Sequence, residues 1–237
     1  MANRELLRTE LVSGLAELSI DLNDEQINKL LDYLDLMNRW NKNINLTAVS
    51  DPIEQVRRHL LDSFSIYPYL SKLGKASPVL DVGTGAGLPG IPMAIAQPDV
   101  QWHMLDNSTK RISFLRIVIT KLKIGNVELI NSRVEDYQPE ELAPDLYPII
   151  VCRAFASLKE ITHNAQHLMA ADGSFLAMKG QYPRKEIADM SESFTVTESY
   201  PLTVPGLSEE RHLLQIQRAL AKENIKGNEQ AVGKTKA

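Results

Sequence analysis

The sequence has 237 residues, 43% of them hydrophobic, a single cysteine and a formal net charge of −4 at pH 7. This is enough apolar material for one domain with a full core, but no apolar run is long enough to cross a membrane. The lone Cys152 excludes an internal disulfide framework and most zinc clusters. The acidic balance gives no global sign of nucleic-acid binding, so any RNA partner has to meet a local basic patch.

Residues 1–75 are expected to form a helical extension. Their apolar residues recur at helical spacing in two segments, which contain Ile27, Leu30, Leu31 and Leu34, and Ile53, Val56, Leu60 and Leu61. Asp24 and Ser50 are the predicted N-caps, the second because Pro52 follows it at a first-turn position. The charged start, MANRELLRTE, lacks the apolar stretch of a secretory signal, which together with the lone cysteine predicts a cytoplasmic protein.

Residues 76–220 have a different pattern, in which short apolar segments alternate with helical stretches. The predicted strands are VLDV, VQWHML, VELI, YPIIVC and SFLAMK, and the predicted helices span 92–97, 108–123, 157–171 and 183–191. This alternation predicts an α/β domain with a mostly parallel sheet and crossover helices on both faces. The segment ESYPLTVPGLSEERHLLQIQRA is expected to add a final strand pair joined by a Pro/Gly loop. The polar tail, 221–237, is expected to be disordered.

The stretch VLDVGTGAGLPGIP, residues 79–92, delivers a predicted buried strand into a loop with alternate glycines, Gly83, Gly85 and Gly87. Glycine has no Cβ and tolerates positive φ, so the backbone can pass close to a ligand. Doubly wound sheets bind ligands at the carboxyl ends of such strands. The sixth position of a dinucleotide fingerprint, GxGxxG, is Leu88 and not glycine, so the loop departs from the pattern for a pyrophosphate.

A carboxylate follows at the end of the second predicted strand, where Asp106 lies 19 residues after Gly87. An acid at this place can take both hydroxyls of a ribose, and it can also cap the helix that begins at NSTKR. The loop and the acid together indicate an adenosyl cofactor without a pyrophosphate, S-adenosylmethionine. A nicotinamide-dependent oxidoreductase is the weaker alternative, because it shares the acid but requires the missing glycine.

Six segments carry a family resemblance: LDVGTGAGLPGIP, LDNSTKRISFL, SRVEDY, CRAFASL, MKGQYP and ERHLLQI. In order and spacing they resemble the bacterial small-subunit ribosomal RNA (guanine-N7) methyltransferase G family, also called glucose-inhibited division protein B. WNKNINLTAV and HLLDS extend the resemblance into the helical region. It implies a class I, Rossmann-like methyltransferase with a seven-stranded sheet. It also implies methyl transfer from S-adenosylmethionine to N7 of one guanine in 16S ribosomal RNA, free or in an assembling small subunit.

The resemblance also implies roles for individual residues. It makes Gly83 and Leu88 cofactor contacts, beside Gly85, Gly87 and Asp106 from the loop pattern, and it gives Val134 and Glu135 the adenine. It places Arg153 at both the cofactor and the entering base, as the candidate catalytic residue; the structural alternative is an arginine paired with Glu135 or Asp136. The sequence departs from the family at Pro148, where Asp is common, and at Cys152, where a small residue such as Ser is usual.

The chemistry of guanine N7 agrees with this set of residues. N7 has an in-plane lone pair and no proton, so its methylation needs alignment of the reactants and no general base. No compelling Ser/His/Asp set is present. Cys152 lies at a strand end, but a small buried thiol is a better interpretation than a nucleophile. A small-molecule methyltransferase on the same fold is the main alternative function.

The candidate RNA-binding residues are Lys110, Arg111, Arg133, Lys179 and Arg211. Lys110 and Arg111 fall in the first turn of a predicted helix, where the macrodipole disfavours cations, and phosphates are candidates to offset that cost. The alternative is a solvated basic face. His163 and His167 are four residues apart but lack a third ligand, so no metal is expected. His59 could lie in the core or approach the cleft. A monomer is expected.

Overall fold

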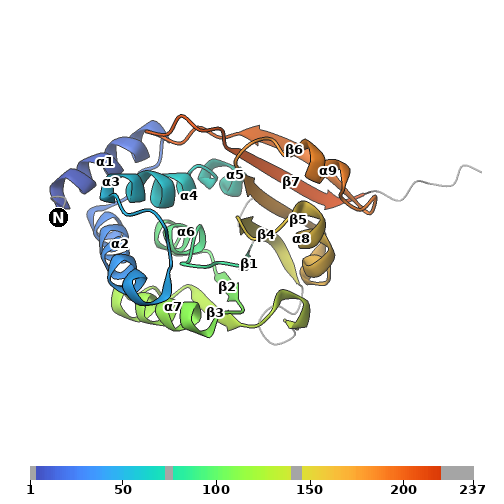
Figure 1. The fold of residues 1–237 in the computed structure, drawn as a ribbon, viewed down its shortest axis with the longest axis horizontal. Helices are drawn as coiled ribbons and strands as arrows, with labels where there is room; N and C mark the ends of the chain where they lie inside the picture. Colours follow the sequence, from blue (N-terminus) through green and yellow to red (C-terminus); the bar gives the residue numbers. More distant parts are fainter. Residues whose placement is uncertain (1–3, 73–76, 140–145, 220–237) are drawn as a thin grey trace, which may run out of the picture.

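The computed structural model describes residues 4–72, 77–139 and 146–219. A seven-stranded sheet lies at its centre, with helices on both faces (Figure 1). The strands are β1 Val79–Val82, β2 Trp102–Asp106, β3 Val127–Asn131, β4 Tyr147–Arg153, β5 Met169–Lys179, β6 Phe194–Pro201 and β7 His212–Arg218. Their order in the sheet is β3-β2-β1-β4-β5-β7-β6. Among the described strands, β7 pairs antiparallel with β5 and with β6, and the other pairs are parallel. The predicted α/β class with a mostly parallel sheet is confirmed.

Helices precede the sheet and connect its strands. In the N-terminal extension they are α1 Arg4–Glu17, α2 Asp24–Ile44, α3 Pro52–Gln55, the π-helical segment η1 Val56–Leu61, α4 Asp62–Phe64 and α5 Tyr67–Lys72. In the sheet region they are α6 Gly90–Ala96, α7 Thr109–Leu122, η2 Val134–Asp136, α8 Leu158–Ala165, η3 Gln166–Leu168 and α9 Arg184–Ala188. The predicted boundary between residues 75 and 76 and the tail 221–237 lie outside the described residues.

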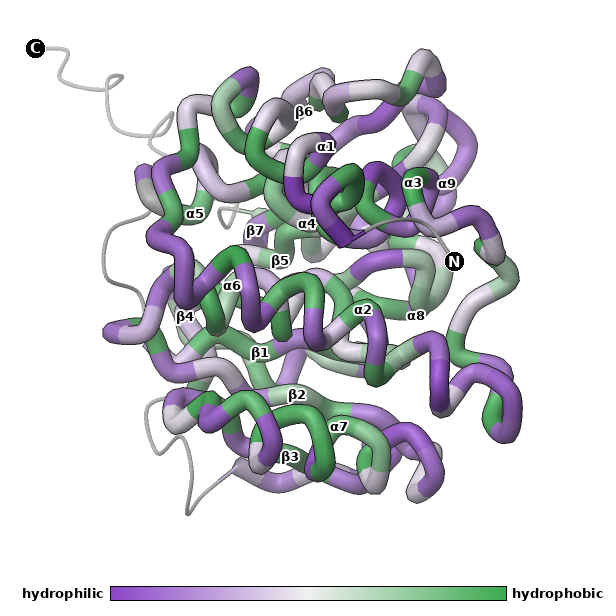
Figure 2. Tube along the Cα trace, turned by 90° about the vertical axis from the view of Figure 1, so that its left-hand side faces the viewer, coloured by the Kyte–Doolittle hydropathy of each residue, from purple (hydrophilic) through white to green (hydrophobic). Residues whose placement is uncertain are grey.

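Two hydrophobic layers cover the two faces of the sheet. Successive strand residues point to opposite faces, so Val79 joins the layer of the N-terminal helices, α6 and α7, whereas Leu80 joins the layer of α8. Figure 2 views the molecule from the side of the N-terminal helices and shows α2, α6 and α7 in front of the strands. Hydrophobic and hydrophilic stretches alternate along α2. The N-terminal helices therefore share one core with the sheet.

Two details of the helix ends differ from the sequence predictions. Asn23 caps α2 by accepting a hydrogen bond from the N–H of Gln26, and Asp51 caps α3 in the same way, so the predicted caps Asp24 and Ser50 are each wrong by one residue. In both cases a neighbouring Asx side chain reaches the N–H three positions ahead. Asp24 lies instead in the first turn, where its charge is favourable.

Two predicted helices are too long. The prediction over 157–171 is wrong beyond Leu168, because Met169 already pairs with Tyr147 as the first residue of β5. The prediction over 183–191 is reduced to Arg184–Ala188, since the chain turns at Ser191 to enter β6. In each case pairing in the sheet overrides a helical pattern.

Candidate active site

The three loop glycines all adopt positive φ, +67° at Gly83, +61° at Gly85 and +96° at Gly87, but for different reasons. A Cβ at Gly83 would collide with the ring of Phe155, and one at Gly87 would lie within 2.7 Å of the Ile91 and Leu115 side chains. A Cβ at Gly85 would meet only the carbonyl of Gly83, at 3.8 Å. Gly83 and Gly87 thus allow close packing, whereas Gly85 lies beside open space.

The carboxylate at the entrance of the loop, Asp81, fixes the shape of the loop. Its Oδ2 accepts hydrogen bonds from the Thr84 hydroxyl at 2.7 Å and from the Gly90 N–H at 3.0 Å, so it ties the start of the loop to the start of α6. The side chain is fully buried and its Oδ1 has no partner. Burial raises the pKa of Asp81 to about 6.

Asp106, at the end of β2, joins the loop to α7. Its Oδ2 accepts from the Gly85 N–H at 3.0 Å, and its Oδ1 accepts from the Ser108 N–H at 2.8 Å. Arg111 approaches Oδ2 at 3.3 Å from the first turn of α7. The carboxylate therefore ties the glycine loop to Ser108, the N-cap residue of α7, whereas its role toward a ribose stays a prediction.

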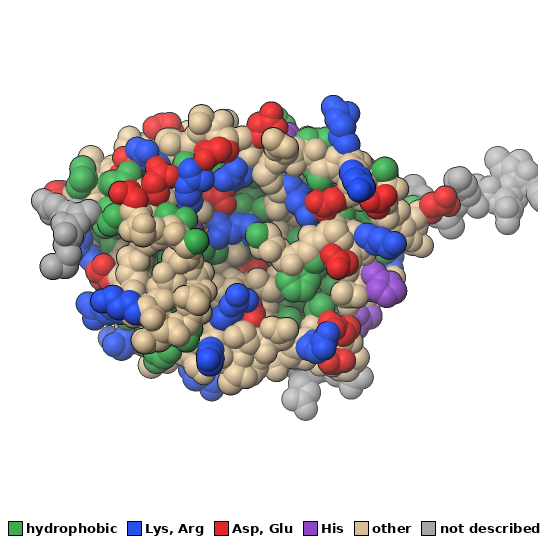
Figure 3. All heavy atoms as spheres, viewed as in Figure 1, with side chains coloured by type: hydrophobic (Ala, Val, Ile, Leu, Met, Phe, Trp, Pro, Cys, Tyr) green, Lys and Arg blue, Asp and Glu red, His purple; other side chains and the backbone are tan. Residues whose placement is uncertain are grey.

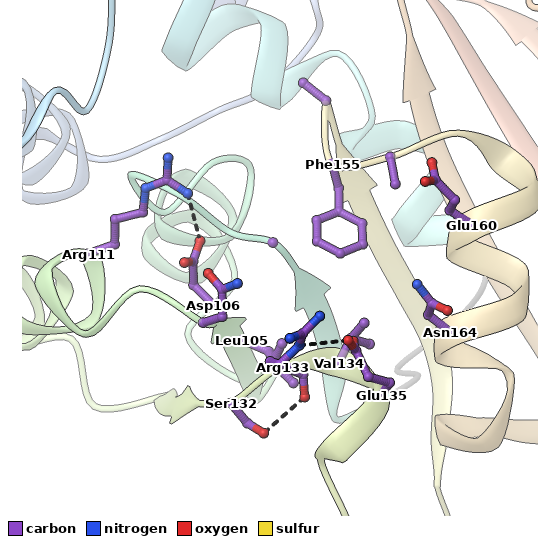
Figure 4. A pocket seen from close by; sticks show the side chains of 14 residues that line it. Leu105, Asp106, Arg111, Ser132, Arg133, Val134, Glu135, Phe155, Glu160 and Asn164 are labelled. Carbon is purple, nitrogen blue, oxygen red and sulfur yellow. Dashed lines mark hydrogen bonds and ion pairs between the residues drawn. The ribbon is translucent and has the colours of Figure 1, made fainter.

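These residues border a cavity of about 390 Å³, called the first pocket here, at the carboxyl ends of β1 to β4. Its lining is Gly83, Leu105, Asp106, Asn107, Arg111, Ser132, Arg133, Val134, Glu135, Ala154, Phe155, Ala156, Glu160 and Asn164. Figure 4 shows Asp106, Val134, Glu135 and Phe155 arranged around it. Of the predicted cofactor contacts, Gly83, Asp106, Val134 and Glu135 line this pocket; Gly85, Gly87, Leu88 and Arg153 do not.

A second pocket, of about 460 Å³, adjoins the first, and Ala154 lines both. Its lining is Val49, Arg58, His59, Asp62, Arg153, Ala154, Met178, Lys179, Gly180, Leu202 and Arg211. It brings the N-terminal extension against the ends of β4 and β5 and the segment before β7. The structure thus gathers three predicted residues here, Arg153, Lys179 and Arg211.

Arg153 has a partner that the sequence analysis did not identify. Its Nη1 donates to Asp62 Oδ2 at 2.8 Å and to the carbonyl of Arg58 at 3.1 Å, and Arg211 Nε donates to Asp62 Oδ1 at 2.9 Å. The alternative partner Glu135 pairs with Arg133 at 2.7 Å instead. Phe155 was also missed as a pocket residue. Asp62 lies in the family-like segment HLLDS, which was the available signal.

The predicted RNA-binding cations divide between the two pockets. Arg111 and Arg133 line the first, and Lys179 and Arg211 line the second. Lys110 is exposed in the first turn of α7 and forms no ion pair within the described ranges. In Figure 3, basic side chains surround a central hollow of the face viewed, interleaved with acidic ones. The cations are therefore arranged around the site, with Lys179 also held by Glu186 at 2.7 Å.

Comparison with known proteins assigns the family. The family model for rRNA small subunit methyltransferase G matches residues 26–214. The chain belongs to this methyltransferase G family. It is 44% identical over 92% of its length to the ribosomal RNA small subunit methyltransferase G of Alteromonas mediterranea, covering all of that protein. It is 45% identical over 87% of its length to the Chromobacterium violaceum protein of the same name, covering 96% of it.

The fold comparison agrees with the family. A glycopeptide N-methyltransferase, MtfA, solved with S-adenosylmethionine, superposes with a TM-score of 0.56 over 68% of this chain and 95% of that one, at 11% identity. The class I methyltransferase fold expected from the resemblance is confirmed. None of the helices in the described part of the chain combines the length and apolarity needed to cross a bilayer.

The two departures from the methyltransferase G pattern have structural accounts. Pro148 lies in β4 where the pairing with β5 shifts register, a place that tolerates a residue without an N–H. Cys152 is buried, and burial raises the pKa of its thiol to about 12, so the thiolate needed for nucleophilic attack is scarce near neutral pH.

The histidines in this methyltransferase G protein offer no metal site among the described residues. His59 satisfies both sequence interpretations, since it is buried and also lines the second pocket. Its Nε2 lies 2.8 Å from the Thr47 hydroxyl, and burial lowers the pKa of His59 to about 4. The ring is therefore neutral at physiological pH.

Proposed function

We propose that this chain transfers a methyl group from S-adenosylmethionine to N7 of one guanine in 16S ribosomal RNA. Family membership supports the reaction class and the RNA. The single observation that carries the proposal is the adjacency of two pockets at the sheet edge, joined at Ala154. A methyl donor in one and a base in the other would meet beside the end of β4.

The first pocket fits the cofactor. Its volume lies within the range of about 300–1,000 Å³ usual for small-ligand sites. Gly83 offers bare backbone, Val134 an apolar wall, and Asp106 a buried carboxylate where a ribose would be held. When bound, S-adenosylmethionine supplies a methyl group already activated by its sulfonium centre. The residues of the pocket have only to bind and orient it.

The second pocket fits a guanine nucleotide. Val49, Met178 and Leu202 offer apolar surface for a planar ring, and Arg153 and Arg211 offer donors. Guanine presents O6 and N7 as acceptors on one edge. Because the N7 lone pair must remain free to accept the methyl group, Arg153 would serve through O6 or a phosphate.

Methylation of guanine N7 needs no general base from the second pocket. The lowered pKa of His59 keeps its ring neutral, as a general base would be. Its Nε2, however, is already hydrogen-bonded with the Thr47 hydroxyl. Guanine N7 carries no proton to remove, so the contribution of the chain is positioning and electrostatics. A base flipped out of its stack would reach such a compact site better than an extended single strand would.

Exposed cations around the hollow would hold the RNA backbone. Lys110 has no competing ion pair within the described residues, and Arg133 is 68% exposed, so both can contact phosphates. Action as a monomer is part of the proposal. A ribosomal RNA substrate supports a cytoplasmic location.

The test of the proposal is incubation with labelled cofactor and naked, partly assembled or complete small-subunit RNA. RNA-dependent incorporation of label supports it. Transfer to small acceptors without RNA would favour the alternative of a small-molecule methyltransferase. The comparisons lend no support to an oxidoreductase, whose test is NAD binding by calorimetry.

A further inference from the structure

We infer that Asp62 is the positioning residue that sets Arg153 and Arg211 for the target guanine in the second pocket. This inference rests on the proposed function and deepens it, because it names the residue that orders the base site. Asp62 begins α4 in the N-terminal extension, whereas its two partners come from the sheet region, at the end of β4 and just before β7.

The geometry divides the two oxygens of one carboxylate between two guanidinium groups. Oδ2 lies 2.8 Å from Arg153 Nη1, and Oδ1 lies 2.9 Å from Arg211 Nε. The Asp62 side chain is 7% exposed, against 19% for Arg153 and 22% for Arg211. The carboxylate is thus the most buried of the three charged groups, and all three residues line the second pocket.

Arg153 keeps part of its hydrogen-bonding capacity for a ligand. Within the described residues its bonds to Asp62 and to the Arg58 carbonyl both use Nη1. A guanidinium also has N–H groups on Nε and Nη2 in a fixed plane. Holding Nη1 on two acceptors therefore fixes the direction in which the remaining donors point.

Asp62 is itself held rigidly, as a positioning residue must be. The adjoining residues Leu60, Leu61 and Phe64 are fully buried in the core shared with the sheet. The preceding segment, η1, is π-helical, a geometry common at functional sites. Without the Asp62 carboxylate, the neighbouring guanidinium groups of Arg153 and Arg211 would repel each other. Each side chain would then turn toward water.

A second ion pair in the extension provides a matched control. Arg57 Nε donates to Glu10 Oε1 at 2.6 Å and links α1 to η1, but neither residue lines the first or second pocket. Each variant removes one partner of an ion pair of the extension. If Asp62 contributed to stability alone, Asp62→Asn and Glu10→Gln would both lower Tm without slowing methyl transfer by the folded protein. If Asp62 orders the base site, only its replacement should alter transfer to RNA.

The experiment compares wild type, Asp62→Asn, Asp62→Glu and Glu10→Gln for single-turnover methyl transfer to 16S RNA, for S-adenosylhomocysteine affinity and for Tm. We expect Asp62→Asn to lower the transfer rate by about a hundredfold, a loss that a misplacement of about 1 Å can produce. Affinity for S-adenosylhomocysteine should stay within about twofold, since Asp62, Arg153 and Arg211 do not line the first pocket. The RNA concentration that gives the half-maximal rate should be unchanged or lower, because a negative charge is lost. Asp62→Glu should recover part of the rate, and Glu10→Gln should lose none.

Two results would overturn the inference. One is a folded Asp62→Asn protein that transfers methyl at the wild-type rate. The other is a loss of rate that Glu10→Gln reproduces at equal Tm, which would make Asp62 a structural residue only. Failure of the wild type to methylate any RNA would overturn the proposed function, and this inference with it, so the two failures are distinguishable.

Discussion

Tyr33 of α2 donates a hydrogen bond of 2.8 Å to the carbonyl oxygen of Ala86 in the glycine loop, 53 positions away. The tyrosine is completely buried. The N-terminal extension therefore supports the loop that borders the first pocket, in addition to forming one side of the second.

Tyr33→Phe should weaken both stability and cofactor binding. It would leave the buried Ala86 carbonyl without its partner, which costs about 1–3 kcal/mol of unfolding free energy. Affinity for S-adenosylhomocysteine, measured by calorimetry, should fall severalfold. Tyr147→Phe is the control, because its hydroxyl bonds to His103 and Tyr137 in the opposite layer. Equal loss of affinity in both variants would contradict the link to the loop.

Gly83→Ala and Gly85→Ala test the loop itself. The two positions have similar positive φ, +67° and +61°, so backbone strain is closely matched. Only at Gly83 does the new methyl group collide, with the ring of Phe155 in the first pocket. Gly83→Ala should therefore bind S-adenosylhomocysteine roughly tenfold or more weakly than Gly85→Ala does. A tenfold difference corresponds to about 1.4 kcal/mol of binding free energy. Indistinguishable affinities would show that the Phe155 contact is unimportant.

Asp81 should make stability depend on pH in an unusual direction. Burial raises its pKa to about 6, above the value of about 3.9 for a solvated Asp. Between these values the native state binds more protons than the unfolded state, so this group lowers the free energy of unfolding as pH rises from about 4 to 6. Urea unfolding should show wild type losing roughly 3 kcal/mol relative to Asp81→Asn across that window. If the unfolding free energies of wild type and Asp81→Asn changed in parallel with pH, Asp81 would not titrate in this window.

Lys110→Glu should weaken RNA binding and leave the cofactor site intact. Lys110 is exposed and unpaired among the described residues, whereas Arg111 beside it approaches Asp106 and lines the first pocket. Loss of one phosphate contact should reduce the slope of log affinity against log salt by about 1. Lys121→Glu, in the last turn of the same helix and lining neither pocket, is the control. An unchanged salt slope would make Lys110 part of a solvated face.

The fold and the first pocket were largely predictable from the sequence. Alternating strands and helices specify a parallel sheet, and the carboxyl ends of its strands meet at one edge, so Gly83 and Asp106 could be placed near each other from their positions alone. The place of Val134 and Glu135 beside them in the first pocket was predicted only by the family resemblance.

The pairing of charged residues in the second pocket could not be predicted from the sequence. Asp62 lies 91 positions from Arg153 and 149 from Arg211, and no periodicity relates residues so far apart. The pairing depends on how the extension packs on the sheet, which tertiary contacts decide. Phe155 was missed for a similar reason, since its ring lies against Gly83, a residue from a distant part of the chain.

The central claim, that Arg153 couples the cofactor site to a guanine, is tested most directly by nucleotide-resolved mapping of methyl transfer to 16S RNA by wild type and Arg153→Lys. Lysine keeps the charge beside Asp62 but loses the planar guanidinium, whose Nε and Nη2 donors are the ones left for the base. We predict a single 7-methylguanosine with wild type and a rate about a hundredfold lower with the equally stable variant. Methylation at another atom, or full turnover by a folded Arg153→Lys protein, would contradict the account.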